Sequence, residues 1–99
     1  MKNNIMQEIE QFITDRNWRQ NHNAKDLAVA ISIESGELLE DFLWLSAEEG
    51  LARNMENIKE ELADVLIYAY QLASLLDLDV EEIMREKIAK NALKYPIEK

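Results

Sequence analysis

Two pairs of acidic residues interrupt the apolar stripes of two predicted helices. Glu34 and Glu37 are three positions apart, and so are Glu61 and Asp64. Residues at i and i+3 share one face of an α-helix, so the two charges of each pair lie close together and repel each other. An unpaired charge on a buried face also costs several kcal/mol. A chain that uses this arrangement twice is predicted to hold a cation between the pairs.

The carboxylate ligands indicate which cation this is. Mg²⁺ takes oxygen ligands in near-octahedral geometry and keeps several waters, which leaves positions open for phosphate oxygens. The predicted metal ligands are Glu34, Glu37, Glu61 and Asp64, with Mg²⁺ as the expected ion and Mn²⁺ as an alternative. A di-iron bundle would use Glu-x-x-His pairs, which no helix here has. Ordinary solvated or salt-bridged acids remain the alternative interpretation.

A cationic and hydrogen-bonding group lies near the C-terminal end of the sequence. Lys87, Asn91, Lys94 and Tyr95 continue one face of a predicted helix. Lysine binds phosphate as a point charge, and Asn and Tyr side chains donate neutral hydrogen bonds. Together with a metal, this group is suited to hold a polyphosphate. The alternative is that these are ordinary lysines near a helix C-terminus, where the helix dipole favours positive charge.

Aromatic residues near the acids are candidates for contact with a nucleobase. Trp44 lies two helical turns after Glu37, and Tyr68 lies one turn after Asp64. Trp18 and the only histidine, His22, fall in the polar segment 17–25. Packing is the alternative role for each. The chain has no Cys and no Ser-His-Asp set, so nucleophilic catalysis by a side chain is not expected.

Four helices are predicted to position these groups. Apolar periodicity indicates helices over 4–16, 24–45, 53–76 and 80–93, with a short helical turn before Gly50. Asn4 and Asn23 are predicted N-caps, and capping boxes are predicted at Ser46 with Glu49 and at Asp79 with Glu82. The expected fold is all-α, a four-helix bundle-like protomer.

Two apolar surfaces suggest how these helices pack. From Leu62 onward the third helix is apolar on almost every side, which in so small a domain predicts a subunit interface. On the fourth helix the apolar side chains Val80, Ile83, Met84 and Ile88 are expected to pack inward.

Composition excludes several functional classes. The 99 residues are expected to form one domain, 1–99, and the net charge of −9 argues against a surface that binds nucleic acid through its phosphates. No apolar run reaches the roughly 20 residues that a membrane span needs, so no membrane partner is expected. The lack of Cys and of an apolar signal core fits a cytoplasmic protein.

The motifs resemble those of a known family, the all-α nucleoside triphosphate pyrophosphohydrolases, in their MazG-like and dCTP pyrophosphatase branch. The resemblance rests on E-x-x-E followed by E-x-x-D and covers nearly the whole chain. It is carried by RNWRQNH at 16–22, ESGELLEDFLW at 34–44, EELADVLIYAYQLA at 60–73 and KIAKNALKYP at 87–96.

The resemblance implies an all-α MazG-like domain that hydrolyses a nucleoside triphosphate to the monophosphate and pyrophosphate, as a homodimer or a dimer of dimers. Such a hydrolase of acid anhydrides fits a role in nucleotide-pool house-cleaning. The resemblance makes Glu34, Glu37, Glu61 and Asp64 the magnesium ligands. It also implies a nucleotide pocket lined by Trp18, His22, Trp44 and Tyr68. The implied phosphate-binding residues are Lys25, Lys87, Asn91, Lys94 and Tyr95. Some of these are expected to bind phosphate in a neighbouring subunit's site.

The hypothetical mechanism has Glu34 or Glu37 take the proton of the attacking water. The sequence departs from the family pattern at Ile9, Asn21 and Asp26, so the preferred base stays open. Two other interpretations also stay open: a non-catalytic helical dimerisation module, and a related enzyme acting on a modified nucleotide or a phosphorylated histidine-pathway intermediate.

Overall fold

The computed structural model describes residues 4–18 and 23–98, and in these ranges all regular structure is helical. The helices are α1 (Ile5–Asp15), α2 (Ala24–Glu40), α3 (Ala47–Leu75) and α4 (Val80–Lys94). The predicted all-α class is therefore confirmed. His22 lies outside the described residues. Within those residues, no helix is long and apolar enough to cross a membrane.

Each helix begins at a predicted N-cap, but Ser46 was expected to cap only a short turn, and α3 begins at Ala47 rather than at Arg53. The side chains of Asn4, Asn23 and Asp79 each accept a hydrogen bond from a backbone N–H of the first turn, at 2.8–2.9 Å. Ser46 and Glu49 form a complete capping box, with reciprocal bonds of 3.1 and 2.8 Å. These bonds satisfy N–H groups that have no partner inside the helix, so local sequence fixes all four helix starts.

The end of α2 differs from the prediction. The helix ends at Glu40 rather than at Leu45, and residues 41–45 form a turn in which Trp44 has a left-handed φ of 64°. The apolar spacing continues through Phe42 and Leu45 although the backbone has already left the helix. Periodicity alone therefore overestimated the length of α2.

A kink divides α3 near the place where two separate helical segments were predicted. Asn54 has non-helical backbone angles, φ −123° and ψ 22°, within the continuous element Ala47–Leu75. Its side-chain amide donates a 2.6 Å hydrogen bond to the backbone carbonyl of Asp41. The kink thus lets α3 secure the turn that follows α2.

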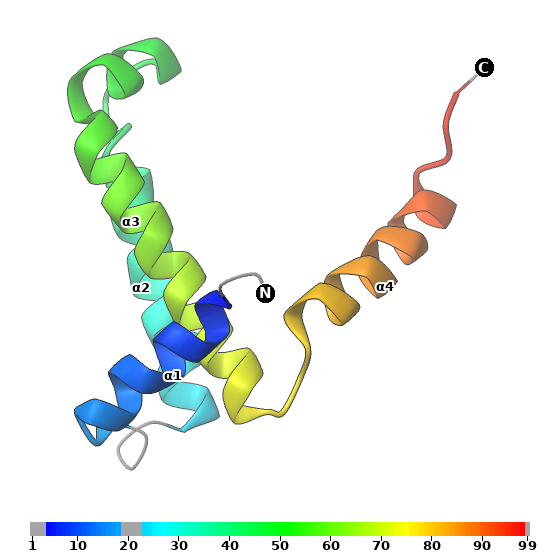
Figure 1. Cartoon of the computed structure of the whole chain (residues 1–99). Helices are drawn as coiled ribbons and strands as arrows, with labels where there is room; N and C mark the ends of the chain where they lie inside the picture. The colour runs from blue at the N-terminus through cyan, green and yellow to red at the C-terminus, as the bar shows by residue number, and fades with distance from the viewer. Residues whose placement is uncertain (1–3, 19–22, 99) are drawn as a thin grey trace.

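The long helices α2 and α3 run side by side, and α1 crosses α3 near the end of the pair (Figure 1). The most buried apolar side chains lie where these three helices meet: Ile9, Ile13, Leu27 and Ala73. A hydrogen bond from the Ser74 hydroxyl to the Glu10 carboxylate also joins α3 to α1. The core therefore lies at one end of the α2–α3 pair.

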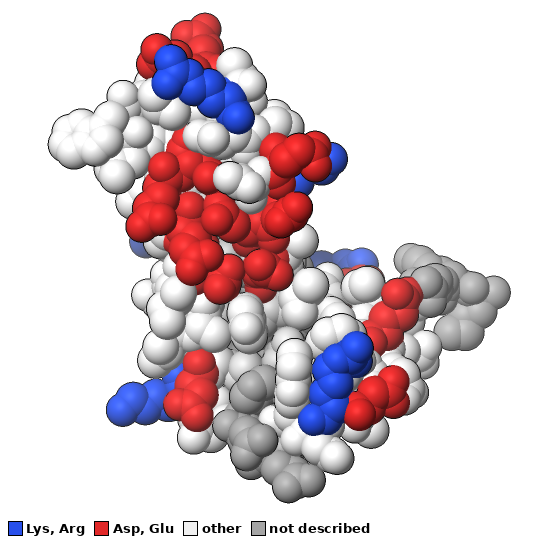
Figure 2. Space-filling view, turned by 90° about the vertical axis from the view of Figure 1, so that its left-hand side faces the viewer, with Lys and Arg blue, Asp and Glu red and all other residues white. Residues whose placement is uncertain are grey.

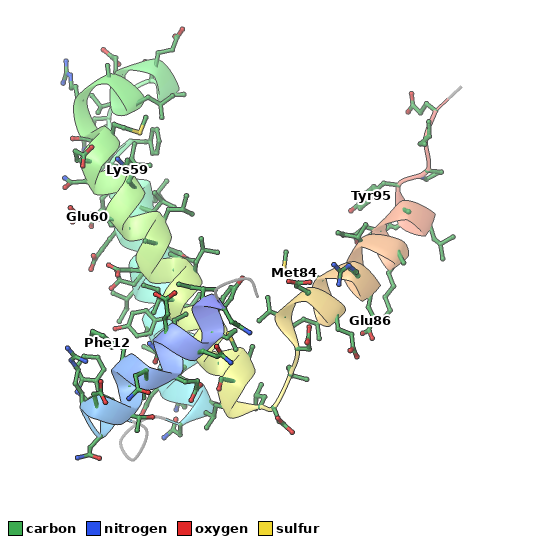
Figure 3. The ribbon with its side chains drawn as sticks, viewed as in Figure 1. Phe12, Lys59, Glu60, Met84, Glu86 and Tyr95 are labelled. Carbon is green, nitrogen blue, oxygen red and sulfur yellow. The ribbon has the colours of Figure 1, made fainter. Side chains whose placement is uncertain are left out.

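Helix α4 projects away from the other three helices (Figure 1). It contains no buried residue, and Ile83, Met84 and Ile88 are 38, 56 and 64% exposed. Figure 3 shows Met84, Glu86 and Tyr95 extending from α4 without side chains of the other helices beside them. The prediction that the apolar side chains of α4 pack inward is wrong for a single chain, because the segment after α3 directs α4 outward.

The two glycines give opposite predictions for stability. A Cβ on Gly50 would lie 2.4 Å from Cδ1 of Phe42, whereas a Cβ on Gly36 would meet nothing within 4 Å. We expect Gly50→Ala to lower the free energy of unfolding by about 1–3 kcal/mol through overpacking. Gly36→Ala should raise it by about 0.5–1 kcal/mol, since alanine is the better helix former. Urea denaturation measures both, and equal stability of the two variants would contradict this packing.

Candidate metal centre

The packing of α2 against α3 brings the two predicted acidic pairs together. The carboxyl of Glu34 is influenced by the charges of Glu37 and Asp64, and that of Glu61 by the charges of Glu37 and Glu34. Figure 2 shows Asp and Glu side chains gathered in one continuous patch on this side of the molecule. Two consecutive helices, packed side by side, thus place all four predicted metal ligands in one cluster.

A fifth carboxylate, Asp41, joins this cluster and was missed by sequence reasoning. Asp41 is only 7% exposed, and its carboxyl lies within hydrogen-bonding reach of the Glu61 carboxyl. The signal in the sequence was its spacing, four residues after Glu37 and seven after Glu34, which continues the same helical face. We use "the carboxylate cluster" below for Glu34, Glu37, Asp41, Glu61 and Asp64.

The proximity of these acids raises the pKa of Glu61 and of Glu34. The hydrogen bond with Asp41, followed by burial and by the charges of Asp41, Glu37 and Glu34, raises the pKa of Glu61 from 4.5 to about 7. Burial, the charges of Glu37 and Asp64, and a hydrogen bond with Asp64 raise the pKa of Glu34 above 4.5. Both shifts have the direction expected when negative charges are held together away from water.

Basic side chains do not offset this charge. In residues 4–18 and 23–98 the ion pairs are Lys59–Glu56 at 3.4 Å and Arg85–Glu81 at 3.1 Å, and neither involves the carboxylate cluster. Across the same ranges, no three acidic or histidine side chains already converge as a finished metal site. Coordination of a divalent cation by these acids would therefore require their side chains to turn toward one another.

The predicted aromatic pocket is brought together only in part. Tyr68 is half-buried on α3, one turn from Asp64. Trp44 is 92% exposed in the turn after α2. Trp18 packs edge-on against Phe12, with ring centroids 5.4 Å apart, at the end of α1. Ile9, one of the departures from the family pattern, belongs to the core and is 7% exposed.

The predicted phosphate-binding residues are not brought to the acids within one chain. Lys25 lies exposed in the first turn of α2. The remaining four belong to α4 and the residue after it, which extend away from α2 and α3 (Figure 1): Lys87, Asn91, Lys94 and Tyr95. Lys94 Nζ lies 5.4 Å from the centre of the Tyr95 ring, so these two side chains are neighbours. Their predicted role requires the acids of another chain.

Comparison with known proteins identifies the family. Residues 29–99, which include α3, α4 and most of α2, match the MazG-like family. The chain belongs to the MazG-like family. This matches the resemblance seen in the acidic motifs.

Individual relatives support the same family. The chain is 36% identical over 92 residues to dCTP pyrophosphatase 1 of Rattus norvegicus and 35% identical over 91 residues to that of Homo sapiens. These alignments cover 88 and 87% of this chain and 54% of each relative, so the chain spans about half the length of these relatives.

A solved structure has the same MazG-like fold over almost its full length. The crystal structure of a pyrophosphatase from Archaeoglobus fulgidus superposes with a TM-score of 0.87 at 38% sequence identity. The superposition covers 98% of this chain and 97% of the other. The all-α fold is therefore shared along the whole chain, α4 included.

The carboxylate cluster predicts an unusual pH dependence of stability. The pKa of Glu61 in the folded chain is about 7, above its ordinary value of 4.5, so the folded state binds this proton more tightly than the unfolded state does. The stabilising contribution is therefore fully present below about pH 4.5 and is lost as the pH rises through about 7. Glu34 acts in the same direction.

We expect the melting temperature in EDTA to fall as the pH rises from about 4.5 to above 7. Glu61→Gln should flatten this slope, because glutamine does not titrate. Glu60→Gln, at the exposed neighbouring position labelled in Figure 3, should keep it. Differential scanning fluorimetry at constant ionic strength measures all three proteins, and an unchanged slope in Glu61→Gln would contradict the assignment.

Proposed function

We propose that this protein is a Mg²⁺-dependent nucleoside triphosphate pyrophosphohydrolase. It would cleave the α–β phosphoanhydride of a (d)NTP with one water, giving a (d)NMP and pyrophosphate. The observation that carries the proposal is the carboxylate cluster, because α2 and α3 gather five acids that no lysine or arginine of the described chain pairs with. The names of the relatives, dCTP pyrophosphatase and pyrophosphatase, support the same reaction class.

The residues present fit a divalent metal ion. The donors are all carboxylate oxygens, which suit Mg²⁺ or Mn²⁺, and Oε1 of Glu61 is buried without a hydrogen-bond partner. Glu34, Glu37, Glu61 and Asp64 would hold the ion. When bound, Mg²⁺ supplies charge neutralisation for the phosphate oxygens and makes a water more acidic.

The chain's own residues supply the proton acceptor. Glu34 or Glu37 would accept the proton of the attacking water. Tyr68, one turn from Asp64 on α3, and Trp44, exposed in the turn after α2, would bind the base by stacking. The α4 lysines would offset the charge on the leaving pyrophosphate.

One assay tests the function. Pyrophosphate release would be measured for each of the eight common nucleoside triphosphates, with Mg²⁺ and with EDTA. We expect turnover of at least one substrate that EDTA abolishes. Glu37→Gln and Glu61→Gln should each lower kcat/KM by about 100-fold or more, since several kcal/mol of metal-dependent stabilisation are lost.

The matched control is Glu48→Gln, which removes the same charge from an exposed position in the first turn of α3. It should keep activity, and circular dichroism should show equal helicity in all variants. Full activity of Glu37→Gln would overturn the metal assignment. Inactivity of the wild type toward all eight substrates, without stabilisation by Mg²⁺ and a nonhydrolysable nucleotide, would favour the helical interaction module. Stabilisation without turnover would favour a modified substrate.

The proposed enzyme is a homodimer or a dimer of dimers. Apolar side chains are left exposed on α3 as well as on α4, with Leu62 at 48%, Leu66 at 51% and Ile88 at 64%. Exposed apolar surface of this extent on neighbouring elements is typical of protein–protein interfaces. Association would also bring the phosphate-binding residues of α4 to the acids of another chain.

Light scattering with size exclusion tests the assembly. We expect the wild type to elute as a dimer or tetramer, and Ile88→Glu to shift it toward the monomer because the new charge lies on the apolar side of α4. Ala89→Glu introduces the same side chain about 100° around the helix and should leave the assembly unchanged. A monomeric wild type, or equal effects of the two substitutions, would contradict the interface.

A further inference from the structure

Asp41 occupies a position that is unfavourable for a carboxylate. It is the C-cap of α2, where the negative end of the helix dipole disfavours another negative charge. It is also 7% exposed, which removes most of its contact with water. Neither cost serves an evident structural purpose, because an apolar side chain would fill the same place without bringing a charge to it.

The backbone holds Asp41 in this position from both sides. Its N–H donates to the carbonyl of Leu38 at 3.2 Å, and its own carbonyl accepts the 2.6 Å bond from the Asn54 side chain at the kink of α3. The backbone of Asp41 is therefore fixed by two different helices, and its carboxyl lies next to that of Glu61. This placement is a property of the fold rather than of a freely moving surface residue.

The two facing carboxyls lack a donor. Oδ2 of Asp41 and Oε1 of Glu61 are both buried, and apart from the contact between the two carboxyls neither atom accepts a hydrogen bond from another group of the described chain. Ionised carboxylates only accept hydrogen bonds, so two of them in contact need either a proton or a cation between them. A buried polar atom without a partner is destabilising, and more so if it is charged. When both carboxyls are ionised, the contact between them calls for a bound cation.

We propose that Asp41 is a fifth carboxylate of the divalent cation site and binds the cation together with Glu61. The inference rests on the proposed function, because it concerns the same ion-binding cluster. It adds a ligand at the C-terminal end of α2, beyond the four acids of the E-x-x-E and E-x-x-D motifs. The charge of Glu37 acts on both Glu34 and Glu61, so it couples the contact of Asp41 with Glu61 to that of Glu34 with Asp64.

The test measures cation binding rather than catalysis. Isothermal titration of the full chain with Mg²⁺, and separately with Mn²⁺, would be done without nucleotide for the wild type, Asp41→Asn, Glu37→Gln and Glu40→Gln. Glu40 is the matched control, because it is an exposed acid one residue away and its substitution removes the same charge. We expect Asp41→Asn to weaken binding by about 10-fold to 100-fold, in the range found when groups supporting a metal site are removed.

Glu40→Gln should leave the affinity nearly unchanged, since an exposed charge contributes little across screened solvent. Without divalent cations, Asp41→Asn should melt at a higher temperature than the wild type, because its amide can donate to Glu61. Its gain in melting temperature on adding Mg²⁺ should be smaller. A merely structural Asp41 would give the opposite result, with lower stability in EDTA and an unchanged gain from Mg²⁺.

The outcomes separate this inference from the proposed function. Wild-type affinity in Asp41→Asn, together with lost binding in Glu37→Gln, would overturn the role of Asp41 and leave the function standing. Equal losses of cation affinity in Asp41→Asn and Glu40→Gln would also overturn it, because they would show that only the net negative charge of the region matters and not a contact with Asp41. No binding by the wild type would instead overturn the function.

A second measurement covers the case in which Asp41→Asn does not fold. Substoichiometric Mn²⁺ should broaden the side-chain carboxyl resonance of Asp41 in the wild-type protein before that of Asp79, which caps α4. Equal broadening of the two resonances would overturn the proposal.

Discussion

Mutual repulsion among acids that the fold holds together is the interaction on which the rest of this structure depends. Glu34 and Asp64 contact each other across α2 and α3, and so do Asp41 and Glu61. The described chain provides no basic side chain to these groups. Their repulsion must therefore be overcome by packing elsewhere, and it stores a free energy that a bound cation would release.

The packing that resists this repulsion lies at both ends of the α2–α3 pair. At one end, α1 closes a small core around Ile13 and Leu27, which are each 3% exposed. At the other end, Phe42 fills the space that Gly50 leaves open, and the Asn54 amide holds the turn after α2. The acids lie between these two fixed points, so the helices cannot separate to relieve the repulsion without breaking one of them.

The helix starts could be predicted from the sequence because each depends on one or two local hydrogen bonds, as at Ser46 and Glu49. The end of α2 could not, since the apolar spacing through Phe42 and Leu45 runs on into a turn. Four acids of the carboxylate cluster were predicted from the sequence because they interrupt apolar stripes. Asp41 follows Glu40 in the sequence and looks like a second surface acid until α3 covers it. The direction of α4 could not be predicted, because it depends on the backbone of residues 76–79 and on contacts that a single chain does not contain.

Because α4 is exposed in a single chain, its stability as a helix is expected to depend on the concentration of the protein. A helix of 15 residues with none buried is at the limit of what is stable alone in water, since isolated helices shorter than about 12–15 residues are marginal. If association between chains covers α4, then the free energy of association offsets the entropy cost of ordering this helix. The fraction of chains in which the predicted phosphate-binding residues of α4 are ordered would then rise with concentration. Dilution alone would lower the activity of the proposed enzyme.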